Sequence, residues 1–139
     1  TNNAKRSVPL AVFTPLLDEP ATRWFSLKWD ADPPGPADAA VATRLVALPQ
    51  RNDFDGLAAL ISELDLVITV DTSIAHLAGA MGKPVWVLLH HAPDWRWMLE
   101  RADSPWYPTA RLFRQRRPGD WSHPMREIQD ALQAMAPGR

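Results

Sequence analysis

An acid, two hydroxyls and a histidine follow one apolar run in this sequence. The run Leu66–Val70 reads as a buried β-strand, and Asp71, Thr72, Ser73 and His76 come directly after it. If a helix begins near Thr72, its free backbone N–H groups and the positive end of its dipole favour an anion such as phosphate. His76 then lies one turn later on the same helix face as Thr72. The set offers a carboxylate for sugar hydroxyls, hydroxyls and amides for phosphate, and an imidazole to neutralise charge.

The same residues also have an ordinary structural explanation. An Asp or Thr at a helix start commonly caps the helix, and a histidine in a helix is more often a hydrogen-bonded polar group than a catalyst. The small residues Ala75, Ala78, Gly79 and Ala80 would permit close packing of a helix on a sheet. In open α/β sheets, however, ligands bind where a strand ends and the next helix begins. The position of the set therefore favours a ligand site over capping alone.

Composition limits the class of protein. The 139 residues, 46% of them hydrophobic, suit one domain or a part of a longer protein. Fifteen basic and sixteen acidic residues leave a net charge of -1, so we expect neither nucleic acid nor an anionic membrane as a partner. The absence of cysteine excludes disulfides, thiol catalysis and cysteine-ligated zinc. We expect no membrane span, no signal peptide and a cytoplasmic location.

Predicted strands and helices alternate along the chain, which indicates an α/β fold with a parallel sheet covered on both faces. The alternation also puts the loops that follow the strands at one edge of the sheet. Apolar spacing, caps and breakers predict helices over residues 7–17, 53–64, 72–81 and 124–135, and strands over 23–29, 44–48, 65–70, 85–89 and 111–114. Gly82 is the expected C′ residue of the helix over 72–81.

Residues 65–89, DLVITVDTSIAHLAGAMGKPVWVLL, resemble the signature of glycosyltransferase family 9, the heptosyltransferase-like enzymes. Residues 93–115, PDWRWMLERADSPWYPTARLFRQ, add a resemblance to the carboxyl-terminal domain of bacterial tetratricopeptide-repeat proteins that carry such a module. The resemblance is strong over 53–121 and weaker before that. It implies a GT-B fold, in which two Rossmann-like domains face each other across a cleft. We therefore expect residues 1–139 to be one nucleotide-sugar-binding domain with a Rossmann-like three-layer parallel sheet, a fragment whose first strand lies before Thr1.

The resemblance also implies roles for individual residues. In this family the carboxyl-terminal domain binds the donor, and the amino-terminal domain binds the acceptor and usually supplies the catalytic base. Asp71 would contact the donor sugar, Thr72 and Ser73 would hold the diphosphate at the helix start, and His76 would support that contact. Many members have Gly or Ala where Ser73 stands, which leaves the role of its side chain open.

Two further groups of residues are candidates for the same cleft. The opening NNAKRS resembles a loop in which basic residues approach the diphosphate, so Lys5 and Arg6 are either donor ligands or part of a solvated tail. The second group follows the strand over 85–89, at the same sheet edge as Asp71, and the resemblance places it near donor or acceptor: His90, His91, Asp94, Trp95 and Arg96. Trp95 and Arg96 either stack on or pair with a ligand or form a structural cation–π contact.

We expect no metal and no other cofactor. Asp53-Phe54-Asp55 has the Asp-x-Asp form of a metal motif of another transferase class, but it precedes an amphipathic run, where helix capping explains it better. His90 and His91 lack a clear third ligand in the sequence, so we predict no zinc site. Family 9-like enzymes stabilise the leaving diphosphate with a helix dipole and side chains instead.

The sequence thus predicts the donor-binding domain of a metal-independent glycosyltransferase of hexosyl or heptosyl type, which moves a sugar from a nucleotide-diphosphate sugar to an acceptor hydroxyl. The expected partners are the nucleotide sugar, an amino-terminal acceptor-binding domain, tetratricopeptide repeats and a second copy of the chain. The alternative is a non-catalytic scaffold or binding module of a tetratricopeptide-repeat protein. A third interpretation, another Rossmann-type enzyme, is disfavoured because these residues contain no G-x-G-x-x-G.

Overall fold

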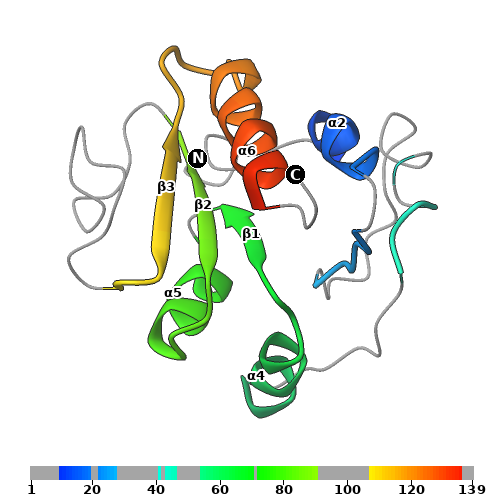
Figure 1. The fold of residues 1–139 in the computed structure, drawn as a ribbon. Coiled ribbons are helices and arrows are strands. Elements are labelled where there is room, and N and C mark those ends of the chain that lie inside the picture. Colours follow the sequence, from blue (N-terminus) through cyan, green and yellow to red (C-terminus); the bar gives the residue numbers. More distant parts are fainter. Residues whose placement is uncertain are drawn as a thin grey trace.

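The computed structural model describes residues 10–19, 22–27, 41, 43–46, 54–70, 72–90 and 107–135. Strands and helices alternate through the central part of these residues, as Figure 1 shows. The elements are the 3-10 helix η1 (Leu10–Phe13), α2 (Thr14–Leu17), α4 (Phe54–Ser62), β1 (Val67–Val70), α5 (Ser73–Ala80), β2 (Val85–Leu89), β3 (Ala110–Arg114) and α6 (Ser122–Met135).

The three strands form one parallel sheet in the order β1-β2-β3. Val67 of β1 lies beside Val85 of β2, which in turn lies beside Ala110 of β3. Every residue of the middle strand β2 is buried, as its wholly apolar sequence VWVLL predicts for a parallel strand covered on both faces. The predicted α/β class with a parallel sheet is therefore confirmed.

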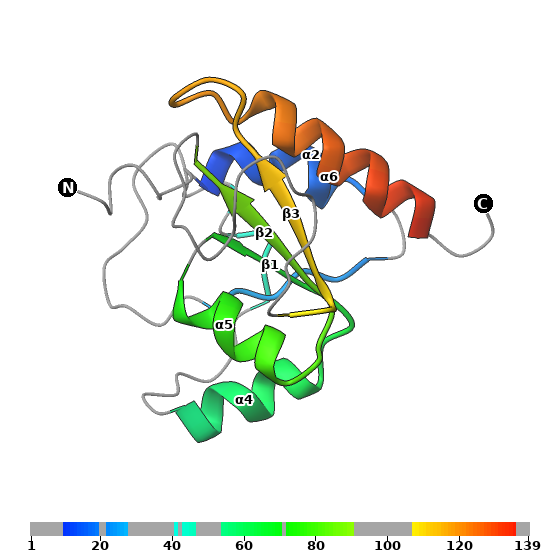
Figure 2. The same ribbon diagram turned by 90° about the vertical axis from the view of Figure 1, so that its left-hand side faces the viewer.

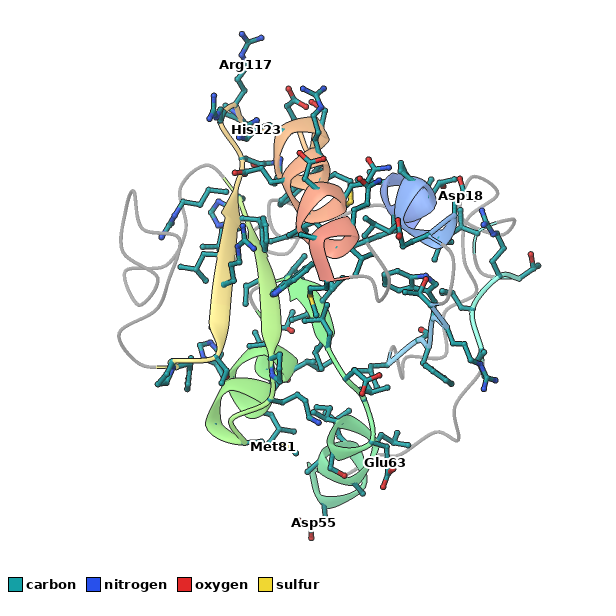
Figure 3. All side chains as sticks on the ribbon, viewed as in Figure 1. Asp18, Asp55, Glu63, Met81, Arg117 and His123 are labelled. Atoms are coloured by element: carbon teal, nitrogen blue, oxygen red, sulfur yellow. The ribbon has the colours of Figure 1, made fainter. Side chains whose placement is uncertain are left out.

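Helices cover both faces of the sheet and make three layers. Figure 2 shows α4 and α5 on one face and α2 and α6 on the other. Because side chains alternate along a strand, β2 contributes to both cores: Val85, Val87 and Leu89 to the core under α4 and α5, and Trp86 and Leu88 to the core under α6. The charged residues Asp55 and Glu63, at the two ends of α4, point away from the sheet in Figure 3.

The end of α5 is closed by a Schellman motif, as the sequence predicts. Gly82 has a φ of 72°, a conformation that glycine adopts without steric cost. Its N–H donates to the carbonyl of Gly79 (3.1 Å), and the N–H of Lys83 donates to that of Ala78 (3.0 Å). The Lys83 ammonium group then donates to the carbonyls of Ser62 (3.1 Å) and Leu64 (2.6 Å), so it also caps the end of α4.

The amino-terminal predictions are correct in part. Instead of one helix over 7–17, the described residues form η1 and then a short α2, because Pro15 has no N–H for an α-helical bond to Ala11. The Thr14 hydroxyl donates to that carbonyl instead (2.7 Å). The predicted strands over 23–29 and 44–48 are wrong for the part that the structure describes, where Phe25 and Val46 form a single parallel bridge.

Helix α6 begins two residues earlier than the sequence predicts, because Asp120 caps it. The Asp120 carboxylate accepts hydrogen bonds from the backbone N–H (2.9 Å) and the hydroxyl (2.6 Å) of Ser122. These bonds, the hydroxyl first and the amide second, hold the pKa of Asp120 below its ordinary value. In the part of the chain that the structure covers, no helix is both long and apolar enough to cross a membrane.

The cap at α6 should make stability depend on acid pH. A carboxyl whose pKa is lower in the folded state contributes stability above its unfolded pKa of about 3.8, and this contribution is lost as the pH falls through the folded pKa. We expect Asp120→Ala to lower the melting temperature at neutral pH, and the difference from the wild type to shrink towards pH ~2. Asp130→Asn, an exposed acid on the same helix, is the control. A difference that stays constant with pH would contradict the prediction.

Candidate functional site

The candidate site is the turn between β1 and α5, at the carboxyl edge of the sheet. Strand β1 ends at Val70, Thr72 is the N-cap of α5 with extended φ and ψ of −139° and 176°, and Ser73 is the first helical residue. The Thr72 carbonyl accepts the N–H groups of Ala75 (3.0 Å) and His76 (3.4 Å), which starts the helix. The structure thus confirms the predicted strand–turn–helix arrangement.

The Thr72 side chain does not cap the helix. Its hydroxyl donates to the carbonyl of Val70 (3.3 Å) and lies 3.3 Å from the hydroxyl of Thr69, so it turns back towards the strand. Among the residues that the structure describes, α5 therefore starts without a hydrogen bond from its N-cap side chain. The N–H groups of Ser73 and Ile74 precede the first intrahelical bonds, and such groups bind anions. The explanation of Thr72 as an ordinary side-chain cap is therefore wrong.

His76 is half-buried on α5, and its imidazole contacts a residue that sequence reasoning missed. Its Nδ1 lies 3.0 Å from the hydroxyl of Tyr107, three residues before β3, and the two rings meet edge to face with centroids 5.6 Å apart. Two signals in the sequence could have pointed to Tyr107: it is the single tyrosine of the chain, and Gly79 leaves room for an aromatic ring one turn after His76.

The carboxyl edge of the sheet, where Thr72 lies, also carries the residues at or just after the ends of the other two strands: His90, Arg114 and Gln115. His90 directly follows β2, and the Gln115 N–H donates to the carbonyl of Leu89 (2.9 Å) just after β3. Gln115 is buried, and partial burial lowers the pKa of Arg114. Sequence reasoning did not select Arg114 or Gln115, although both stand where the third strand ends. The remaining predicted site residues lie outside the described residues: Lys5, Arg6, Asp71, His91, Asp94, Trp95 and Arg96.

The described residues contain no group of three His, Asp or Glu side chains that could hold a metal ion. Of the Asp-x-Asp sequence, Asp53 lies outside the described ranges, and Asp55 is exposed in the first turn of α4. An acid in the first turn of a helix is stabilised by the helix dipole, in line with the capping explanation. The absence of a metal from the reaction stays a prediction.

The parallel sheet with helices on both faces defines an α/β protein, a class in which ligands commonly bind at the carboxyl edge of the sheet. The chain belongs to glycosyltransferase family 9 (heptosyltransferase), whose family model matches residues 37–132, a range that includes β1, α5, β2 and β3. The resemblance drawn from residues 65–89 is therefore confirmed at the level of the family.

A relative among well-described proteins is Protein FlbA of Caulobacter vibrioides. It is 37% identical to the chain over 84 residues, which are 60% of this chain and 14% of FlbA. The chain thus spans a small part of the length of that relative. No solved structure matches the chain.

Proposed function

We propose that this chain is the donor-binding domain of a glycosyltransferase, the carboxyl-terminal half of a GT-B fold. The proposed reaction moves a hexosyl or heptosyl group from a nucleotide-diphosphate sugar to an acceptor hydroxyl in the cytoplasm. The observation that carries the proposal is the start of α5 at the carboxyl edge of β1, inside the region that matches family 9. The family supplies the reaction class, and the helix start supplies a place for the diphosphate.

In the proposed mechanism, the acceptor oxygen attacks the anomeric carbon of the donor while the bond to the diphosphate oxygen breaks. The acceptor proton goes to a base that we assign to another domain, since no residue here is assigned that role. The leaving diphosphate gains negative charge, and the N–H groups at Ser73 and the dipole of α5 stabilise that charge without a metal. His76 adds a donor, and Asp71 orients a hydroxyl of the donor sugar.

In this proposal the other predicted residues surround the diphosphate or line the cleft. Lys5 and Arg6 approach the diphosphate, and His90 follows β2 at the edge where the diphosphate would bind. The segment after His90 lines the cleft towards the donor or the acceptor, through His91, Asp94, Trp95 and Arg96. An amino-terminal acceptor-binding domain, tetratricopeptide repeats and a second copy of the chain are the proposed partners.

The decisive test removes the two side chains closest to the proposed chemistry. We expect Asp71→Ala and His76→Ala, each in the full-length protein, to lower kcat/KM for sugar transfer about tenfold or more, because a hydrogen bond to a charged group contributes about 1.5–3 kcal/mol. A thermal-shift panel of ADP-, GDP- and UDP-sugars first identifies the donor, and a CMP-sugar, which carries a single phosphate, is the negative control. Ser62→Ala is the control, since the exposed Ser62 hydroxyl bonds only locally, to the carbonyl of Ala59.

Unchanged transfer and nucleotide binding in both variants would contradict the assignment of this site. If the full-length wild type binds no nucleotide sugar and transfers no sugar, the scaffold function becomes the better explanation. In that case the tryptophan-rich segment would be the surface to test for binding to tetratricopeptide repeats.

A further inference from the structure

Tyr107 is held against α5 by two contacts one helical turn apart. Its hydroxyl lies 3.0 Å from Nδ1 of His76, and its ring lies over Gly79. Residues three apart lie on the same face of a helix, so a single side chain can reach both positions. Tyr107 precedes β3, and β3 pairs with β2 rather than with β1, so the contact joins the helix of the candidate site to the far strand of the sheet.

The position of the Tyr107 ring depends on the missing side chain of Gly79. A Cβ at Gly79 would lie 2.5 Å from Cγ and 2.8 Å from Cδ1 of Tyr107, closer than real Cβ contacts, and 3.0 Å from its Cβ, which is tighter than most real contacts. These atoms form the rigid base of the ring, so only a shift of the whole side chain would relieve the clash. Gly79 and Tyr107 thus form a fitted pair that sets where the hydroxyl lies.

The hydroxyl contact bears on which nitrogen of His76 carries a hydrogen, because a phenol can either donate to Nδ1 or accept from it. When the phenol donates to Nδ1 of the neutral ring, the hydrogen of the imidazole is on Nε2. When the ring is protonated, Nδ1 donates to the phenol oxygen, and Nε2 still carries a hydrogen. In both states the nitrogen away from Tyr107 is a hydrogen-bond donor, which is the group that a phosphate oxygen requires.

The helix geometry directs this donor towards the candidate site. Side chains on a helix lean towards its amino terminus, so we expect the imidazole of His76 to lie towards the turn that contains Thr72 and Ser73. Tyr107 approaches from the other side, because its ring lies over Gly79, one turn closer to the carboxyl end. In that arrangement the hydroxyl would support the ring on the side away from the start of α5.

We propose that Tyr107 is a positioning residue, which holds His76 in the orientation and tautomer that present Nε2–H to the diphosphate of the donor, and that Gly79 provides the space it needs. This inference rests on the proposed function, since the diphosphate is the ligand of that site. Tyr107 acts through His76 and contacts neither the donor nor the reacting atoms in this proposal.

The test compares three variants of the full-length protein. Tyr107→Phe removes only the hydroxyl, Gly79→Ala displaces the ring, and Thr109→Val removes a nearby hydroxyl that donates to the carbonyl of Lys83 (2.9 Å), away from His76. The probes are ADP, GDP and UDP, titrated by calorimetry. We expect Tyr107→Phe and Gly79→Ala to weaken binding of the nucleotide that the wild type binds, with a Kd about three- to tenfold higher. We expect Thr109→Val to leave this Kd unchanged.

A nitrogen NMR spectrum of histidine-labelled protein gives a readout that a purely structural role would not change. The His76 signals are assigned by their loss in His76→Gln. In mildly alkaline buffer we expect Nε2 to carry the hydrogen in the wild type, and the Nδ1-protonated form to gain population in Tyr107→Phe while the melting temperature changes little. A hydrogen on Nδ1 in the wild type, or a tautomer and affinity unchanged in Tyr107→Phe, would overturn the proposal.

The two proposals fail in different ways. If His76→Gln weakens nucleotide binding and Tyr107→Phe does not, the role of Tyr107 is wrong and the proposed function stands. If the wild type binds none of the three nucleotides, the proposed function fails and the role of Tyr107 falls with it.

Discussion

Phe113→Ala should lower the free energy of unfolding by about 3–5 kcal/mol, the usual cost of removing a buried phenylalanine. Phe113 is 2% exposed, in the core between the sheet and α6. Its ring lies 5.5 Å from that of Trp86 on the neighbouring strand, and the Arg111 guanidinium lies 5.0 Å above its centroid. The variant therefore loses buried area, an aromatic pair and a cation–π contact together.

Urea denaturation of the wild type and Phe113→Ala, followed by circular dichroism, measures this loss. Met135→Ala is the matched control, because Met135 ends α6 with 54% of its surface exposed and should lose less than about 0.5 kcal/mol. A loss below about 1 kcal/mol in Phe113→Ala would mean that α6 does not pack on the sheet as described.

Ile61→Ala is the second large effect, with an expected loss of about 2–5 kcal/mol. Ile61 is fully buried and joins α4 to the core on the opposite face of the sheet, which also contains Val67 of β1. Because α4 leads directly into β1, loss of this contact should also loosen the strand that positions Thr72. Denaturation measures the stability, and hydrogen exchange at the β1 amides measures the loosening.

Ser62→Ala is the control for Ile61→Ala, since the neighbouring Ser62 is exposed and its hydroxyl bonds within α4, to the carbonyl of Ala59. If Ile61→Ala were as stable as Ser62→Ala, α4 would not be part of the core. If stability fell without faster exchange in β1, the helix would stabilise the domain without holding the strand.

Local signals predicted the central elements well. The bounds of β2 follow from five apolar residues between Pro84 and His90, and the end of α5 follows from Gly82, the residue that tolerates its φ. The start of α6 was missed by two residues because Asp120 caps from outside the apolar pattern. The strands predicted around Phe25 and Val46 meet in the described residues as a single bridge, because a strand needs a ladder of paired residues, which β-propensity alone does not supply.

The residues of the candidate site likewise fall into those that local sequence signals predicted and those that they did not. Thr72, Ser73 and His76 come from one strand–turn–helix unit, so their spacing alone placed them together. Tyr107 lies 31 residues after His76, and only the pairing of β2 with β3 brings the two together. Arg114 and Gln115 reach the edge through the same pairing. Periodicity does not encode contacts of this range, which is why these residues were not predicted.

The parallel pairing of β2 with β3 has a consequence for how this family can vary. The chain from His90 to Thr109 must return to the opposite end of the sheet before β3 can begin. The entropic cost of closing such a connection rises by only about 0.6 kcal/mol when its length doubles. A few inserted or deleted residues before Tyr107 would therefore cost little, provided that Tyr107 still reaches Gly79. The length of this connection can thus vary while the sheet and the start of α5 stay unchanged.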